Sequence, residues 1–185
     1  NTISFFENNG TIATFGGTGT IYGVINSKTI TNSFENVATS LWNKENALIT
    51  GNVALKGTKQ DCSDSGSTIC NTSDLINEGT ITGNVTNEKT DSIYYFSNTG
   101  TIGGSIANSG SINTFEVSGT IANGITNHSN IGSLIVNESV SYNGNGSDRI
   151  TQALEVAKDK TLTIQNSGSS NGTLYFNSTT NGTID

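Results

Sequence analysis

Isoleucines and other apolar residues recur at a fixed interval in the middle of this chain, and the interval is nineteen residues. The segment 100–108 reads Gly-Thr-Ile-Gly-Gly-Ser-Ile-Ala-Asn, and 119–127 reads Gly-Thr-Ile-Ala-Asn-Gly-Ile-Thr-Asn. A fixed period is typical of repeat proteins, in which each unit buries its apolar face only against its neighbours. We therefore predict a series of similar coils that stack along one axis.

Alignment of the repeats places equivalent residues in columns, which we expect to become neighbours in successive coils. These columns are Gly79/Gly100/Gly119, Thr80/Thr101/Thr120, Ile81/Ile102/Ile121, Val85/Ile106/Ile125, Asn87/Asn108/Asn127, Ile93/Ile112/Ile131 and Phe96/Phe115/Leu134. The apolar columns predict the core. The asparagine column predicts a ladder of side-chain amides from coil to coil.

The spacing inside one unit predicts its strands. Alternate residues of a strand face opposite sides, so Ile102, Ile106 and Asn108 are expected to face inward from one strand. A short second strand is expected around Ile112, followed by a bend, because the apolar spacing to Phe115 is three residues. Phe115 then begins a third strand, and glycine or asparagine supplies positive φ at the bends.

The predicted fold is thus all-β: a parallel β-helix with three short strands per coil of roughly 19–21 residues. It forms a single domain over residues 1–185, with about nine coils. The segment 57–73 is almost devoid of apolar residues and interrupts the period, which predicts an inserted surface loop. The chain begins without Met and already in pattern, so we interpret it as a fragment of a longer protein.

Composition narrows the choice of partners. Apolar residues make up 32% and charged residues 12% of the chain, with 22 Gly and no Pro. The formal net charge of −7 argues against nucleic acid, since phosphate binding needs a basic patch. No apolar run approaches the length of a membrane-spanning helix.

Two cysteines, Cys62 and Cys70, lie eight residues apart in the interrupting segment. This spacing is poor for zinc, which favours closer pairs with two further ligands. We favour a local disulfide between them, which would indicate an oxidising compartment, with two free thiols as the alternative. We expect no metal site and no cofactor.

The repeated N-x-G-T-I-x-G-x-I-x-N coils, the poverty in Cys and Pro, and the close cysteine pair resemble the passenger domains of bacterial type V autotransporters. A related coil pattern occurs in two-partner filamentous haemagglutinins. The resemblance implies a right-handed β-helix, located on the bacterial cell surface or secreted, with a translocator β-barrel elsewhere in the full-length protein. Members of the family include adhesins, toxins and proteases, so the resemblance alone selects no activity.

Enzymatic motifs are weak. Asp64-Ser65-Gly66-Ser67 is similar to the segment around a trypsin-like nucleophile, but the single histidine, His128, follows it, and Ser63 stands where that motif has Gly. Glu116, Glu138 and Glu155 do not share a column at a period of nineteen, so no carboxylate pair is expected. We assign no catalytic residue.

The leading hypothesis is a non-enzymatic adhesin or virulence factor that binds a host-surface protein, matrix or glycan. The alternatives are a β-helix carbohydrate-active enzyme, lyase or hydrolase, and a passive structural stalk.

Three further surface features were weighed. The threonine column raises ice binding, but the companion positions Thr82, Gly103 and Ala122 do not complete a second column. Tyr22, Tyr94, Tyr95 and Trp42 are expected at or near bends, where they are candidates for partner contact. For Trp42 we favour the alternative that it fills the core of an irregular coil. Asn9 alone among the Asn-x-Ser/Thr sequons has an acidic residue two positions earlier, so it is the candidate glycosylation site.

Overall fold

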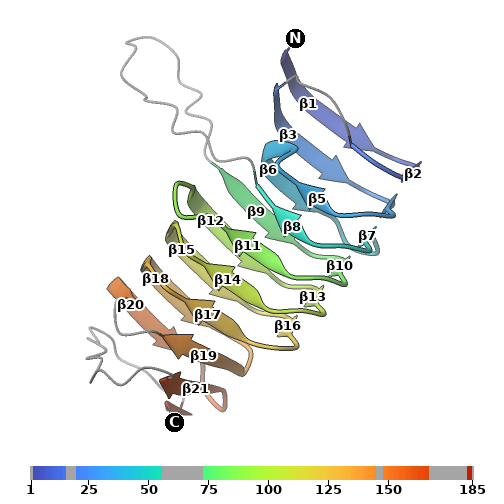
Figure 1. The fold of residues 1–185 in the computed structure, drawn as a ribbon. Helices are drawn as coiled ribbons and strands as arrows, with labels where there is room; N and C mark the ends of the chain where they lie inside the picture. The colour runs from blue at the N-terminus through green and yellow to red at the C-terminus, as the bar shows by residue number, and fades with distance from the viewer. Residues whose placement is uncertain (1, 16–19, 56–72, 145–147, 167–182, 185) are drawn as a thin grey trace.

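The chain forms a parallel β-solenoid of about seven turns (Figure 1). The computed structural model describes residues 2–15, 20–55, 73–144, 148–166 and 183–184. In these residues every regular element is a β-strand, and the strands pair in parallel. The predicted all-β parallel β-helix is confirmed.

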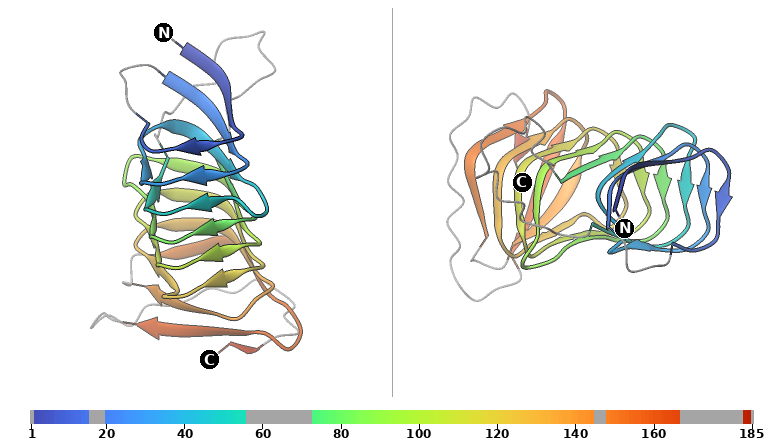
Figure 2. Two further views of the ribbon diagram at one scale, coloured as in Figure 1. Left: turned by 90° about the vertical axis from the view of Figure 1, so that its right-hand side faces the viewer. Right: turned by 90° about the horizontal axis from the view of Figure 1, so that it is seen from above.

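The strands form three sheets, here called A, B and C, which run along the solenoid axis (Figure 2). Sheet A contains β1 (Thr2–Asn8), β3 (Thr20–Asn26), β6 (Ala38–Asn43), β9 (Asp74–Asn77), β12 (Ser92–Asn98), β15 (Ser111–Val117), β18 (Asn130–Val136) and β20 (Arg149–Val156). Sheet B contains β2 (Thr11–Ile12), β4 (Thr29–Ile30), β7 (Leu48–Ile49), β10 (Thr80–Ile81), β13 (Thr101–Ile102) and β16 (Thr120–Ile121). Sheet C contains β5 (Phe34–Glu35), β8 (Val53–Ala54), β11 (Val85–Asn87), β14 (Ile106–Asn108), β17 (Ile125–Asn127), β19 (Val140–Gly144), β21 (Thr161–Asn166) and β22 (Thr183–Ile184).

The number of coils is smaller than the nine predicted. Sheet A has eight strands in the described residues, which corresponds to seven steps along the axis. The estimate divided the whole chain by the period. However, Leu41 of β6 pairs directly with Leu75 of β9, so thirty-four residues separate these two neighbouring positions. Some of the sequence therefore adds length without adding a coil.

The core lies inside the coils and follows the predicted columns. Ile81 pairs with Ile102, and Ile102 pairs with Ile121, each at most 8% exposed. Phe96 and Phe115 are fully buried, and their rings stack with centroids 4.5 Å apart. Equivalent apolar side chains thus pack against each other in successive coils, and each coil buries the apolar surface of its neighbour.

The division of each coil into strands differs from the prediction. Residues 101–108 form two strands, β13 and β14, because the chain bends at Gly103–Ser105. Conversely, Ser111–Val117 is one strand, although a bend was expected after Ile112. The register pairs Ile93 with Ile112 and then Tyr95 with Thr114, leaving one position in between unmatched. This local irregularity accounts for the three-residue apolar spacing without a bend.

Glycines at the bends serve close approach of the backbone, not positive φ as predicted. Among the described glycines only Gly124 has positive φ, at 71°. A Cβ at Gly100 would instead overlap the carbonyl oxygen of Gly79 in the coil before it. The positive-φ positions occupied by asparagine are Asn36 and Asn46, which agrees with the tolerance of Asn for this region.

The predicted asparagine ladder is confirmed in sheet C. The side-chain amide of Asn87 donates to the Asn108 oxygen at 2.7 Å, and Asn108 donates to Asn127 at 2.6 Å. All three residues are at most 3% exposed. Buried amides of this kind need partners for both the carbonyl and the NH2 group, and the neighbouring coil supplies them.

A second asparagine ladder, which was not predicted, lies at the C-terminal ends of strands in sheet A. Its members are Asn8, Asn26, Asn43, Asn77 and Asn98, with each amide donating to the next oxygen at 2.7–2.8 Å. Most of these amides also donate to a backbone carbonyl of the next coil, as Asn77 does to Thr101 at 3.3 Å. After Asn98 the column continues with Val117 and Val136, so the ladder covers only the N-terminal part of sheet A.

Tyr142 ends the ladder of sheet C. Its hydroxyl accepts from Asn127 at 2.7 Å and donates to Asp148 at 2.9 Å, and the side chain is 1% exposed. Burial raises the pKa of the Tyr142 phenol well above its ordinary value, and the nearby Asp148 carboxylate raises it further. The folded protein therefore holds this proton at a pH where the unfolded chain releases it.

Replacement of Tyr142 by Phe is expected to flatten the loss of stability at alkaline pH. A tyrosine in the unfolded chain titrates near pH ~10. Above that pH unfolding releases the Tyr142 proton, so the stability of the native chain falls as pH rises. Urea titrations between pH 7 and 11 would measure this. We expect Tyr142→Phe to be less stable at pH 7, where Asn127 loses a partner, but to fall less steeply above pH 10. An equally steep fall in the variant would contradict this assignment.

Candidate functional site

The outer face of sheet A carries the exposed aromatic residues of the described chain. At the irregular position of β12 two consecutive residues, Tyr94 and Tyr95, face outward between the buried Ile93 and Phe96. Tyr94 is 57% exposed and Tyr95 is half-buried. Tyr22 occupies the corresponding irregular position of β3 and is half-buried. The three tyrosines therefore lie within strands of one sheet, and their predicted place at bends is wrong.

Trp42 belongs to the same face. It lies on β6 between the buried residues Leu41 and Asn43, and it is 38% exposed. The expectation that it fills the core is therefore wrong, because strand alternation directs it outward. Its column continues through Ile25 on β3 and Ile76 on β9. Together these three side chains form the apolar strip, a name used here for Ile25, Trp42 and Ile76.

Charged and aromatic groups border the apolar strip at its N-terminal end. The Lys44 ammonium lies 5.3 Å from the centroid of the Trp42 ring and 3.8 Å from the Glu7 carboxylate. Phe5, which is 70% exposed, lies across Gly23, where an added Cβ would come within 3.1 Å of the ring. Exposed apolar side chains that adjoin one another are a feature of interaction surfaces.

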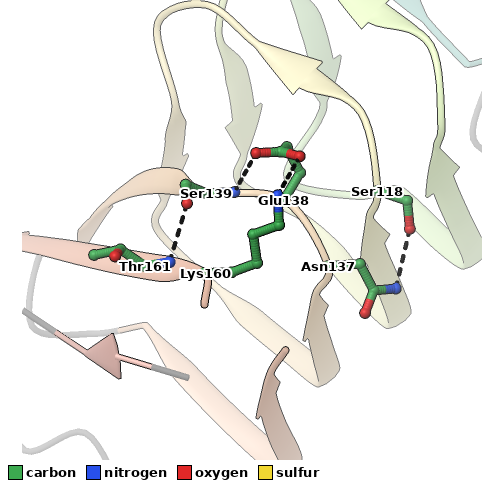
Figure 3. Close-up of polar contacts among 6 residues, drawn as sticks. All are labelled: Ser118, Asn137, Glu138, Ser139, Lys160 and Thr161. Atoms are coloured by element: carbon green, nitrogen blue, oxygen red, sulfur yellow. Dashed lines mark hydrogen bonds and ion pairs between the residues drawn. The ribbon is translucent and has the colours of Figure 1, made fainter. Parts of the chain in front are cut away.

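A polar cluster continues the face toward the C-terminus. The Tyr95 hydroxyl donates to Glu116 Oε2 at 2.7 Å, while Ser118 Oγ and Asn137 Nδ2 donate to Glu116 Oε1 at 3.0 and 3.2 Å. Asn137 Nδ2 also donates to Ser118 Oγ at 3.0 Å (Figure 3). The hydrogen bond to Glu116 raises the pKa of Tyr95, with burial adding to the effect. We call Tyr95, Glu116, Ser118 and Asn137 the acceptor cluster.

The residues that follow Asn137 form a separate set of contacts between coils (Figure 3). Lys160 Nζ donates to Glu138 Oε2 at 2.8 Å, and the Ser139 backbone N–H donates to Glu138 Oε1 at 3.1 Å. The Lys160 hydrogen bond lowers the pKa of Glu138. Thr161 N–H donates to Ser139 Oγ at 3.0 Å. These contacts join the bend after β18 to β21 and its preceding turn, so we interpret them as structural.

Two carboxylates share an outward column of sheet A, which was not expected from the sequence. Glu116 pairs with Ile135, and Ile135 pairs with Glu155, so Glu116 and Glu155 do share an outward column. A constant period of nineteen would place these two residues in different columns. The register shifts between Ile131 and Ser133 opposite β20, which makes this step twenty residues long. Two coil spacings separate the two strands, about 9.6 Å.

The remaining predicted residues do not gather at this face. Asn9 is exposed in the bend between β1 and β2, and Glu7 is exposed beside it. His128 is exposed at the bend after β17. Cys62, Cys70, the segment 64–67 and residues 57–72 of the predicted loop lie outside the described residues.

Sheet B presents the predicted threonine column to solvent, with Thr101 and Thr120 exposed. Its companion column is richer in threonine than the three clear repeats indicated, because Thr31 and Thr50 precede Thr82 in it. Gly103 and Ala122 still interrupt that column. A β-favouring residue on a solvated face accounts for the pattern.

Comparison with known proteins found no match to any family model, curated protein or solved structure. Within the described residues, no group of three or more His, Cys, Asp or Glu side chains is arranged to hold a metal ion. In the same residues no helix has the length and apolar character needed to cross a membrane.

Proposed function

We propose that this chain is a non-enzymatic binding module of a bacterial surface or secreted protein, and that it contacts a host surface through the outer face of sheet A. The observation that supports the proposal most is the exposure of Trp42 and Tyr94 on a sheet whose inner face is fully packed. Exposed aromatic residues on a rigid scaffold bind with little loss of conformational entropy. The resemblance to autotransporter passengers agrees with such a role.

Simultaneous replacement of Trp42 and Tyr94 by Ala tests the proposal. The purified chain is added to host epithelial cells and to coated matrix proteins, and bound protein is measured. We expect the double variant to bind at least about 30-fold more weakly, the usual effect of losing an aromatic anchor. Leu48→Ala is the matched control, because Leu48 is an outward apolar residue of sheet B, and it should bind like the native chain. Equal binding by the double variant and the native chain would contradict the proposal.

A second candidate function, a carbohydrate-active enzyme, is favoured by one observation. Glu116 and Glu155 share an outward column on strands about 9.6 Å apart. The two carboxyl groups of inverting glycosidases are about 6.5–9.5 Å apart. Depolymerisation of a polysaccharide by the native chain, abolished in Glu155→Gln, together with no binding to any host surface, would replace the adhesin proposal by this one.

A further inference from the structure

We propose that the acceptor cluster and Tyr94 form a subsite for a neutral oligosaccharide, oriented along the solenoid axis. This inference rests on the proposed binding function of sheet A and names its ligand class. It starts from the hydrogen atoms of the cluster. The Tyr95 and Ser118 hydroxyls donate to Glu116, and the Asn137 amide donates to Glu116 and Ser118, which lie on the same side of its nitrogen. Most donors of the cluster are therefore directed at acceptors inside it.

Some acceptor lone pairs of the cluster, in contrast, have no hydrogen-bond donor within the described residues. A carboxylate offers about four acceptor sites, and Glu116 uses three of them on Tyr95, Ser118 and Asn137. The side-chain oxygen of Asn137 accepts no hydrogen bond from the described residues, and Asn137 is exposed. A ligand that fits this surface must therefore supply several hydrogen-bond donors. Sugar hydroxyls do so without carrying charge.

The Tyr94 ring supplies the second element of a sugar site. It is 57% exposed and directly precedes Tyr95, so its apolar surface adjoins the cluster. Aromatic rings combine a large apolar contact area with low conformational entropy, and the C–H face of a pyranose can lie against such a ring. The neighbouring outward residues, Asn113 and Thr114 on β15, are polar and half-buried. The exposed ring of Tyr94 therefore lies among polar neighbours.

The arrangement of the cluster gives the orientation. Tyr95 lies on β12, Glu116 on β15 and Asn137 directly after β18, which are three successive strands of sheet A. Two coil spacings amount to about 9.6 Å, the length of two sugar rings. The internal hydrogen bonds hold the acceptors in place before the ligand arrives, which reduces the entropic cost of binding.

Charge selects neutral over anionic sugars. The cluster centres on an ionised carboxylate, and the chain carries a formal net charge of −7. Sialylated, sulfated or uronic oligosaccharides would meet repulsion both at Glu116 and over the longer range of the protein field. A binding site for acidic glycans would need the opposite sign of charge.

A printed array of matched neutral, sialylated and sulfated oligosaccharides, probed with the whole chain, tests this inference. The neutral oligosaccharide that binds best is then titrated in solution against four variants. We expect Glu116→Gln and Tyr94→Ala to bind at least about tenfold more weakly, since each removes a main contact. Glu138→Gln, which changes a carboxylate outside the cluster, should bind like the native chain, and Tyr94→Phe, which keeps the ring, should bind more tightly than Tyr94→Ala. Thermal melting of each variant verifies that it is folded.

Two results would overturn the subsite. One is an array on which no neutral oligosaccharide binds or anionic ones bind as well. The other is a neutral ligand whose affinity survives both Glu116→Gln and Tyr94→Ala. These results are distinct from failure of the proposed function, because the array uses no cells. If the chain binds host cells but no neutral oligosaccharide, the subsite is wrong and the binding function stands. If it binds neither cells nor matrix, the binding function is wrong whatever the array shows.

Discussion

Replacement of Asn77 by Ala is expected to lower the free energy of unfolding by about 3–5 kcal/mol. Asn77 is fully buried at the centre of the sheet A ladder. It accepts from Asn43 and donates to Asn98, each at 2.8 Å. Alanine would leave a buried donor on one neighbour and a buried acceptor on the other, and each unpaired group costs about 1–3 kcal/mol. The small cavity adds to this loss.

Urea unfolding followed by far-ultraviolet circular dichroism measures the effect. Asn130→Ala is the matched control, because Asn130 is an exposed asparagine at the first position of a sheet A strand. Its variant should stay within about 0.5 kcal/mol of the native chain. Asn77→Asp gives a further readout: the ionised carboxylate cannot donate to Asn98, whereas the protonated acid can, so this variant should regain stability as pH falls toward 4. Similar losses in Asn77→Ala and Asn130→Ala would show that the ladder does not stabilise the fold.

Replacement of Gly100 by Ala is expected to cost about 3 kcal/mol. The added Cβ would overlap the carbonyl oxygen of Gly79 and lie 2.6 Å from the carbonyl carbon of Glu78, both backbone atoms of the preceding coil. A flexible side chain could move away, but here two paired coils must separate. Such a shift would also strain the hydrogen bond from the Gly100 N–H to the backbone carbonyl of Asn77, which is 3.0 Å long.

Gly10→Ala provides the comparison for this prediction. Gly10, like Gly100, lies two residues after a ladder asparagine and precedes a Thr-Ile pair. However, no atom lies within 4 Å of an added Cβ at Gly10, and its φ is not positive. Its variant should be neutral or slightly more stable, because alanine reduces the entropy of the unfolded chain. Thermal melting of both variants measures the difference. If Gly100→Ala and Gly10→Ala melt at the same temperature, the coils can move apart at little cost in stability.

The sequence predicted the fold well where the period is constant. From Gly79 to Leu134 the seven predicted columns agree with the register of the structure wherever pairs are defined, for example Val85 with Ile106 and Ile106 with Ile125. Parallel coils bring residues one period apart into direct contact, so repetition in sequence becomes contact in space. The confirmed ladder of Asn87, Asn108 and Asn127 was visible for the same reason.

The second ladder was not visible because its period varies. The steps from Asn8 to Asn26, Asn43, Asn77 and Asn98 are 18, 17, 34 and 21 residues. Similar residue patterns also do not always adopt the same strands. Residues 20–26 and 101–108 both begin with Thr-Ile and end on an asparagine two residues after a β-branched apolar residue. Yet 20–26 form one strand of sheet A, whereas 101–108 span β13 and β14. Similar residues therefore do not fix which sheet a segment joins.

The candidate site was harder to predict than the fold. Its aromatic members were named from the sequence, but their placement on one face depends on the irregular position within sheet A strands. At that position Tyr94 and Tyr95 both point outward, which simple alternation forbids. Glu116 and Asn137 meet because β15 and β18 end side by side, twenty-one residues apart in sequence. No pattern of residue types in the chain indicates that these two side chains are in contact.

A scan of the three faces tests most directly the central claim that sheet A carries binding. One lysine is placed on each sheet, as Trp42→Lys on A, Thr101→Lys on B and Thr126→Lys on C, and binding of each folded variant to the same host cells is measured. All three variants add the same charge, one on each face. The account predicts loss of binding for Trp42→Lys alone. Loss in either of the other two variants with Trp42→Lys unaffected would contradict it.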